Sequence, residues 1–187
     1  MPLVTGIFTP EEARTGHYLD ASLADAIFKM GTATNSVIDI GCGNGSYCKF
    51  FSSRGWSNVT GYEGTLTKNV FYDNIIEADF TKDCVTFPKT DIVLCLEVGE
   101  HIPQQFEQMF LGKISAAVGG LLILSWAVPG QSGLGHVNCR PNSYIKEELQ
   151  KRGLIFCEEE TLSLRLASSI WWFANTIMVF KPTIPNS

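Results

Sequence analysis

Apolar and polar positions follow one another with spacings that predict alternating helices and strands over most of the chain. Apolar residues recur at helical spacing over residues 20–30, and Gly31 follows as a helix stop. Short apolar runs predict strands, and residues 91–96 form an almost unbroken one, as expected for a parallel strand buried on both faces. The expected strands are 37–40, 59–62, 74–78, 91–96 and 121–126, and the expected helices between them are 46–54, one that begins at Pro103, and one from 142 or 143 to 152.

The two ends of the chain depart from this alternation. Thr9-Pro10-Glu11-Glu12 is typical of a helix start, with Thr9 as N-cap and Glu12 completing a capping box. Near the other end, residues 154–165 and 175–181 predict two strands without a clear crossover helix, and a short connection favours antiparallel pairing. Strands that alternate with helices and then close in an antiparallel pair predict an α/β three-layer sandwich.

Length and composition indicate a globular chain of one domain. The chain has 187 residues, and its 45% hydrophobic and 18% charged residues exclude a disordered protein. The net charge of −5 argues against a strongly basic surface for nucleic acid. The longest apolar run, 121–128, falls short of the roughly 20 residues of a membrane span, and no secretory signal is visible. Six cysteines without a Cys-x-x-Cys pair favour reduced thiols, so we expect a cytoplasmic protein away from membranes.

A glycine-rich turn joins the first expected strand to the helix that follows it. In Asp39-Ile40-Gly41-Cys42-Gly43-Asn44-Gly45 the glycines let the backbone turn tightly and bring its N–H groups against a ligand. A dinucleotide fingerprint would need another glycine at Ser46, and an acid at position 39 suits a ligand that carries positive charge. Glu63 ends the second strand, where a carboxylate can accept ribose hydroxyls, and Asp79-Phe80 ends the third, where they can meet an adenine.

Taken in order on consecutive strand ends, these residues resemble the class I S-adenosylmethionine (SAM)-dependent methyltransferases over residues 35–181, most specifically over 37–45. The resemblance implies a seven-stranded, mostly parallel sheet whose last strand is antiparallel. It also implies a single domain over residues 1–187, in which a helical segment, 1–34, lies over the cofactor site. The implied SAM contacts are Asp39, Gly41, Gly43 and Gly45 at the amino acid end, Glu63 at the ribose, and Asp79 and Phe80 at the adenine.

The fourth expected strand ends in the acid-rich segment Glu97-Val98-Gly99-Glu100-His101. Ligands of open α/β sheets bind beyond the carboxyl ends of the strands. In one turn of helix-like backbone, Glu97, Glu100 and His101 project to the same side. Two carboxylates and an imidazole can hold a divalent cation of the Mg, Mn, Fe or Zn group, and His136 on the loop after the fifth strand is a fourth candidate ligand.

This Glu-x-x-Glu-His segment with a later histidine is similar to two metal-using branches of the family. These are the ubiquinone-pathway O-methyltransferases and the small-RNA 3′-end 2′-O-methyltransferases, in which the metal orients a hydroxyl and lowers its pKa. His136 follows His101 by 35 residues, in a loop that departs from both branches. A site without metal therefore stays open, in which Glu97 or His101 acts as a base or contacts the substrate or SAM.

Other candidate side chains have a structural explanation beside the functional one. The aromatic run Trp171-Trp172-Phe173 either walls a substrate pocket or packs in the core. The same choice between a ligand contact and a core or surface position applies to Trp126, His17, Tyr18 and Arg140, and the run 158–160 is expected on an exposed face.

We therefore expect an enzyme, a SAM-dependent methyltransferase whose acceptor is an oxygen of a small molecule. An oxygen nucleophile must lose a proton to a base or a metal, and His101 with Glu97 or Glu100 is the expected place for that step. An RNA methyltransferase is one alternative, against which the acidic pI and the lack of a Lys/Arg run argue. A SAM-binding, non-catalytic partner subunit is another, against which the intact glycine loop and polar cluster argue.

Overall fold

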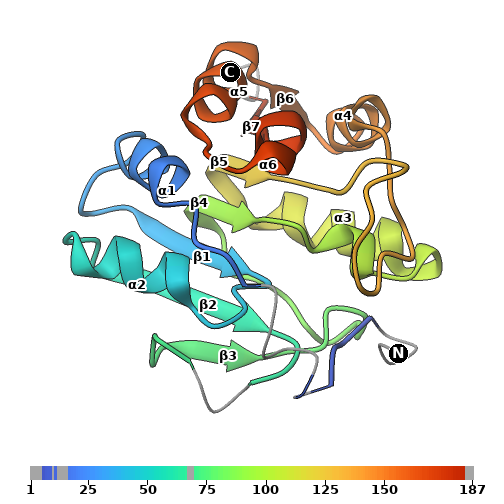
Figure 1. Ribbon diagram of the computed structural model, residues 1–187, viewed down its shortest axis with the longest axis horizontal. Coiled ribbons are helices and arrows are strands. Elements are labelled where there is room, and N and C mark those ends of the chain that lie inside the picture. The colour runs from blue at the N-terminus through green and yellow to red at the C-terminus, as the bar shows by residue number, and fades with distance from the viewer. Residues whose placement is uncertain (1–5, 10, 12–16, 67–69, 184–187) are drawn as a thin grey trace.

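The computed structural model describes residues 6–9, 11, 17–66 and 70–183, and these contain one seven-stranded sheet in the order β3-β2-β1-β4-β5-β7-β6 (Figure 1). Strands β1 to β5 are parallel to one another, whereas β7 is antiparallel to both β5 and β6. The predicted three-layer sandwich with a seven-stranded sheet and an antiparallel last strand is confirmed. The strands are β1 (Ser36–Ile40), β2 (Asn58–Glu63), β3 (Ile75–Glu77), β4 (Thr90–Cys95), β5 (Val118–Leu124), β6 (Leu154–Phe156) and β7 (Met178–Pro182).

Helices cover both faces of the sheet. On one face lie α1 (Ala21–Phe28), α2 (Ser46–Ser53), α5 (Glu158–Ala167) and α6 (Trp171–Thr176), and on the other lie α3 (Glu107–Ala117) and α4 (Asn142–Gln150). Successive residues of β4 serve the two layers in turn, because Val93 packs with α3 and α4 while Leu94 packs with α1 and α2. This double burial explains the unbroken apolar run that predicted a central strand.

The predicted helix over 20–30 is present as α1, with Asp20 as its N-cap. One carboxylate oxygen of Asp20 accepts the backbone N–H of Leu23, and the other accepts the hydroxyl of Ser168 and the backbone N–H of Ser169. The carboxylate therefore ties the start of α1 to the link between α5 and α6. Of the helix start expected at residues 9–12, Pro10 and Glu12 lie outside the described residues, as do residues 13–16.

The strand predicted over 154–165 is wrong beyond residue 156. The chain leaves β6 after three residues and forms α5, and a second helix, α6, precedes β7. Three glutamates in the first turn of α5 favour its helix N-terminus. Only Thr161 and Leu164 of α5 are buried, whereas Leu162 and Leu166 are exposed, so the apolar positions do not mark one helical face. The connection from β6 to the last strand, β7, therefore contains two helices. The short connection expected from the sequence is not the reason for the antiparallel pairing of these two strands.

Candidate functional site

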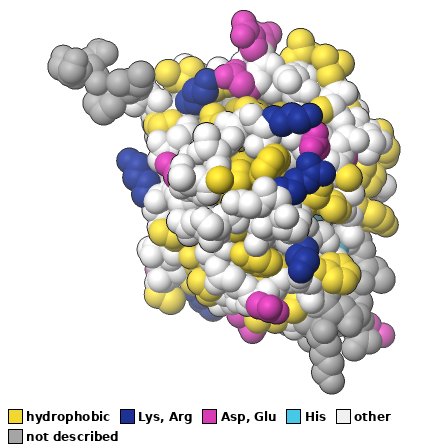
Figure 2. All heavy atoms as spheres, turned by 90° about the vertical axis from the view of Figure 1, so that its left-hand side faces the viewer, with side chains coloured by type: hydrophobic (Ala, Val, Ile, Leu, Met, Phe, Trp, Pro, Cys, Tyr) yellow, Lys and Arg dark blue, Asp and Glu magenta, His cyan; other side chains and the backbone are white. Residues whose placement is uncertain are grey.

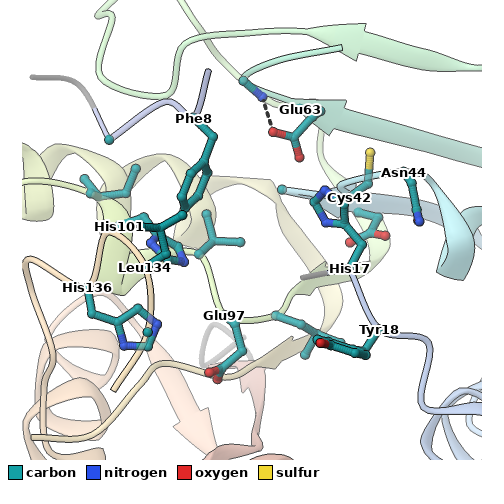
Figure 3. Close-up of a pocket in the computed structure, with 18 of the residues that line it drawn as sticks. Phe8, His17, Tyr18, Cys42, Asn44, Glu63, Glu97, His101, Leu134 and His136 are labelled. Carbon is teal, nitrogen blue, oxygen red and sulfur yellow. Dashed lines mark hydrogen bonds between the residues drawn. The ribbon is translucent and has the colours of Figure 1, made fainter. Parts of the chain in front are cut away.

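The carboxyl ends of β1, β2 and β4 open onto a cavity of about 440 Å³, within the usual size range of small-molecule sites. Residues of the N-terminal segment, the loop after β5 and helix α6 complete its walls (Figure 3). The structure brings most of the sequence-predicted site residues together here: Asp39, Gly41, Glu63, Phe80, Glu97, His101 and His136 line this cavity.

The glycine loop and the end of β2 form one wall. Gly41 and Gly43 have φ angles of +75° and +58°, which side chains rarely adopt. A Cβ atom at Gly43 would also lie 2.2 Å from Nδ1 of His17. The backbone N–H of Gly43 donates to Oε2 of Glu63 at 2.7 Å, and that of Gly64 donates to Oε1 at 2.8 Å, the bond drawn as a dashed line in Figure 3. Burial raises the pKa of Glu63, and these backbone bonds oppose the shift.

Asp39 lies beneath this wall as a buried carboxyl group, only 3% exposed. The Cys48 thiol donates to its Oδ2 over 3.6 Å, which is a weak hydrogen bond. Burial raises the pKa of Asp39 to about 7, and the charge of Glu63 adds to the rise. A carboxylate with so little compensation is suited to meet a cationic ligand.

Of the two residues predicted at the adenine, the structure brings only Phe80 to the cavity. The Phe80 ring is buried and stacks on Phe110 with ring centroids 5.9 Å apart. Asp79 does not line the cavity, because Oδ1 of Asp79 accepts both the backbone N–H and the hydroxyl of Thr81. That side chain serves the turn after β3.

Glu97 adopts a strained backbone conformation at the floor of the cavity. Its φ of +53° makes it the one non-glycine residue in the left-handed region in the described part of the chain. Its backbone N–H donates to the Ser125 hydroxyl at 2.8 Å. Its carboxylate accepts the Gln131 side-chain amide at 2.6 Å and the Thr176 hydroxyl at 3.3 Å. Such strain costs about 1–3 kcal/mol and persists where surrounding contacts impose it, which is common at functional sites.

Beside Glu97, three side chains bring potential metal-ligand atoms within 4.8 Å of one another: Glu100, His101 and His136. Glu100 is fully buried, and neither of its carboxylate oxygens has a hydrogen-bond partner in the described structure. Oε1 of Glu100 lies 3.9 Å from Nε2 of His136. The Glu97 carboxylate is not a member of this group of three, because Gln131 and Thr176 hold it.

Backbone carbonyls fix the orientation of both imidazole rings. Nδ1 of His101 lies 3.1 Å from the carbonyl oxygen of Gly135, and Nδ1 of His136 lies 3.0 Å from that of Gln131. A carbonyl only accepts, so each Nδ1 carries a proton and Nε2 is the nitrogen that can offer a lone pair to a ligand. Metal-binding histidines are usually oriented in this way.

Burial also sets the charges of this group. It raises the pKa of Glu100 well above its usual range, and the neighbouring Glu97 carboxylate adds to the rise. Burial lowers the pKa of His101 to about 4, so this imidazole is neutral at neutral pH. A neutral imidazole with this pKa serves as a ligand or hydrogen-bond partner more readily than as a general base near pH 7.

The residues of uncertain role separate into two sets. His17 and Tyr18 line the cavity, and so do all three residues of Trp171-Trp172-Phe173. Trp126 is fully buried in the core, and Nε1 of Trp126 donates to the carbonyl oxygen of Asn138. Arg140 pairs with Glu107 at 2.6 Å and is therefore not directed at the cavity. Glu158 and Glu159 are exposed, as the charge run predicts.

Sequence reasoning missed four residues that shape the site. Ser125, Gln131 and Thr176 hold Glu97, and Phe8 packs edge-on against His101 with ring centroids 4.9 Å apart. Gln131 and Thr176 lie 34 and 79 residues from Glu97 along the chain. No local pattern marks such partners, because the fold alone brings them together.

Known proteins share both the sequence pattern and the fold. Residues 15–159 match a family described as Methyltransferase domain. The fold resembles a TehB-like SAM-dependent methyltransferase from Corynebacterium glutamicum (16% identity, TM-score 0.63, 91% of this chain and 92% of that chain). It also resembles magnesium protoporphyrin IX methyltransferase from Synechocystis with bound SAH (15%, 0.59, 91% and 90%) and 1,6-didemethyltoxoflavin-N1-methyltransferase from Burkholderia thailandensis (14%, 0.59, 88% and 80%). No curated protein matches the sequence.

Proposed function

Because the chain belongs to the class I SAM-dependent methyltransferases, a family of enzymes, we propose that it methylates an oxygen of a small molecule. The cavity size suits small ligands. Two of the structural neighbours are named for small-molecule acceptors, magnesium protoporphyrin IX and 1,6-didemethyltoxoflavin. These observations support a small acceptor, and the cluster at the end of β4 supports an oxygen nucleophile.

One observation carries the cofactor assignment: the glycine loop and Glu63 are hydrogen-bonded to each other along one wall of the cavity. SAM supplies an electrophilic methyl group on a sulfonium when it is bound. We assign Glu63 to the ribose hydroxyls, Phe80 to the adenine ring, and Asp39 with Gly41, Gly43 and Gly45 to the cationic amino acid end. The buried walls orient the ligands and exclude water, which methyl transfer requires.

At the acceptor end, we assign Glu97 to the reacting hydroxyl, together with His101 where no cation occupies Nε2 of that ring. Both line the cavity, and the Glu97 carboxylate is held at two oxygens, so its position is fixed before a ligand arrives. A fixed carboxylate can accept the hydroxyl hydrogen and orient the oxygen toward the methyl group.

We further propose that Glu100, His101 and His136 hold a divalent cation. A fully buried carboxylate without a hydrogen-bond partner is costly unless a cation or a proton compensates it. The two Nε2 lone pairs complete a set of three ligands that suits Mn, Fe or Zn better than Mg. A cation bound there would lower the pKa of the acceptor hydroxyl. Glu97 lies beside these three residues and is the candidate fourth ligand in this proposal.

The cofactor assignment is tested by calorimetry with S-adenosylhomocysteine (SAH). Glu63→Gln should weaken SAH binding by about 10- to 100-fold, because charge-assisted hydrogen bonds to the ribose are lost. Glu77 is the register partner of Glu63 on β3 and is exposed, so Glu77→Gln is the matched control. Equal SAH affinity in the two variants would contradict the role of Glu63, and no SAH binding by the unmodified protein would remove the proposed function.

The cation assignment is tested by titrating Mn²⁺, Zn²⁺ and Mg²⁺ into the protein and its variants. His136→Asn should lose at least about 100-fold in affinity, since it removes a ligand rather than an outer-shell group. The third histidine of the chain, His17, also lines the cavity but lies outside the ligand group, so His17→Asn should bind the cation as the unmodified protein does. A cation that binds equally well to His136→Asn occupies another site.

Turnover is tested by incubating the protein with SAM and acceptor mixtures and measuring SAH above a SAM-only control.

An RNA acceptor is the alternative to a small molecule. The face that Figure 2 shows, at the amino ends of the strands, has basic and acidic side chains interspersed rather than gathered by sign. Turnover that needs RNA and falls steeply with salt would favour the RNA alternative. Turnover that needs a second protein would favour a non-catalytic partner subunit.

We also propose that residues 1–187 act as one domain in the cytoplasm. All six cysteines are free thiols, which suits a reducing compartment. None of the helices in the described part of the chain combines the length and apolar character that crossing a bilayer requires.

A further inference from the structure

The outer part of the cavity is walled by large apolar side chains that remain open to solvent. Tyr18 and Trp171 are each 63% exposed, and Leu134 is 58% exposed. The Trp172 ring lies edge-on to Tyr18 and to Trp171, with ring centroids 6.0 and 5.7 Å apart. Exposed apolar side chains that gather at one cavity, rather than singly, are typical of a ligand-binding surface.

These side chains lie on different sides of the opening. Figure 3 shows Phe8 and Leu134 on the side of His101, and Tyr18 across the cavity beside His17. They come from the N-terminal segment, the loop after β5 and helix α6, so no single element determines this arrangement. Aromatic rings that face an opening from two sides favour a flat ring between them.

The charges along the cavity have one sign. Asp39, Glu63 and Glu97 line it, and neither lysine nor arginine contributes to its lining within the described residues. Arg140, in the same loop as His136, is paired with Glu107. In the metal-free protein, an acceptor that carries a carboxylate or phosphate would therefore meet like charge without an ion-pair partner, whereas aromatic rings and carboxylates both favour a cationic group.

We propose that the methyl acceptor is an aromatic compound that is neutral or cationic, and that the cavity discriminates against anionic acceptors. This inference rests on the proposed function, because it gives the inner wall of the cavity to the cofactor and the outer wall to the acceptor. The aromatic walls supply the affinity, and the carboxylates supply the discrimination.

The test uses three phenols that share a ring and hydroxyl and differ in the charge of a short arm: tyramine, tyrosol and 4-hydroxyphenylacetate. Each is titrated, in the presence of EDTA, into the SAH-saturated protein and followed by tryptophan emission and calorimetry. Trp56 and Trp126 are buried, so a change in emission reports on Trp171 and Trp172. The cation and the alcohol should bind at least about tenfold more tightly than the anion.

A matched pair of variants tests the walls. Trp171→Ala should weaken tyrosol binding about three- to tenfold, and Trp171→Phe should restore part of the loss. Phe71 is also exposed, at 59%, but lies outside the cavity lining, so Phe71→Ala should leave tyrosol binding unchanged. SAH affinity should be the same in all three variants.

The outcomes separate this inference from the proposed function. If SAH does not bind, the proposed function fails first. If SAH binds but 4-hydroxyphenylacetate binds as tightly as tyrosol, or none of the three phenols binds, the acceptor class proposed here is overturned and the cofactor assignment stands. Equal losses in Trp171→Ala and Phe71→Ala would also overturn it.

Discussion

Two buried carboxylates seven residues apart, Glu100 and Glu107, have opposite surroundings. Glu107 is 2% exposed, and its oxygens accept hydrogen bonds from Asn138, Arg140 and Tyr144. Burial raises the pKa of Glu107, but these three partners outweigh it and hold the pKa below its usual value. Glu100 is fully buried, has no hydrogen-bond partner, and has a raised pKa.

The contrast indicates that Glu107 stabilises the fold, whereas Glu100 is placed to bind a ligand. The Glu107 network joins α3 to the segment 138–144, which leads from the site loop into α4, so its satisfaction stabilises the protein. A buried carboxylate without hydrogen-bond partners lowers the free energy of unfolding. A protein retains such a group where the binding of a ligand compensates for this loss. If this is right, removing the two side chains should change stability in opposite directions.

The largest expected effect is a loss of stability in Glu107→Leu. The variant leaves the Arg140 guanidinium without its ion pair and the Asn138 and Tyr144 donors without an acceptor. We expect the free energy of unfolding to fall by about 3–5 kcal/mol, measured by chemical denaturation. Glu107→Gln keeps an acceptor of the same shape and should lose less. Equal stability of Glu107→Leu and the unmodified protein would show that the network is not structural.

The next effect concerns Asp39, the other buried carboxylate with little compensation. In the folded protein the pKa of Asp39 is about 7 against a usual value of 3.8, so the folded state keeps a proton that the unfolded chain releases. The unmodified protein therefore loses stability as pH rises from about 4 to 7. Asp39→Asn avoids this loss and should be more stable above pH 7 by up to about 4 kcal/mol.

The same variant should bind SAH more weakly, because it lacks the charge that we assign to the amino acid end of the cofactor. Denaturation at pH 5 and pH 8, with calorimetry on SAH, measures both effects. A stability difference that does not grow with pH would contradict the raised pKa. Unchanged SAH binding would contradict the assignment of Asp39 to the cofactor.

A smaller effect on the free energy of unfolding is expected for Glu100→Gln, and its sign should depend on whether the cation is present. Without a cation, the variant should be more stable than the unmodified protein by about 1–3 kcal/mol, since a neutral amide is less costly to bury. With the cation at a hundredfold excess over its dissociation constant, the unmodified protein should gain about 2.7 kcal/mol and the variant should gain almost none. Thermal unfolding with and without Mn²⁺ measures both. A variant that is less stable without the cation would place Glu100 with Glu107, as part of the fold.

The difference between residues marked by local spacing and residues held by distant partners explains how much of the fold and of the site the sequence could predict. The glycine loop follows directly on β1, and Asp39 and Glu63 lie in the last residues of β1 and β2, where short-range spacing marks them. The strands from β1 to β5 have recognisable apolar runs. The partners of Glu97 and Glu107 come from distant segments, and the strain at Glu97 has no local signature. Helix α5 was not predicted because two of its three leucines, Leu162 and Leu166, face solvent, so its amphipathic pattern is weak.

The smallest effect is expected for Glu160, a partly exposed carboxylate that serves as a reference for the other three carboxylates. Glu160 accepts from the Lys181 ammonium at 2.5 Å, but the two side chains are 32% and 49% exposed, so water and salt screen the pair. Glu160→Gln should change the free energy of unfolding by less than about 0.5 kcal/mol, and the change should vanish at high salt, as denaturation at two ionic strengths would show. A loss of the size expected for Glu107→Leu would mean that charge removal by itself destabilises this protein. The opposite signs at Glu100 and Glu107 could then no longer be attributed to the presence or absence of hydrogen-bond partners.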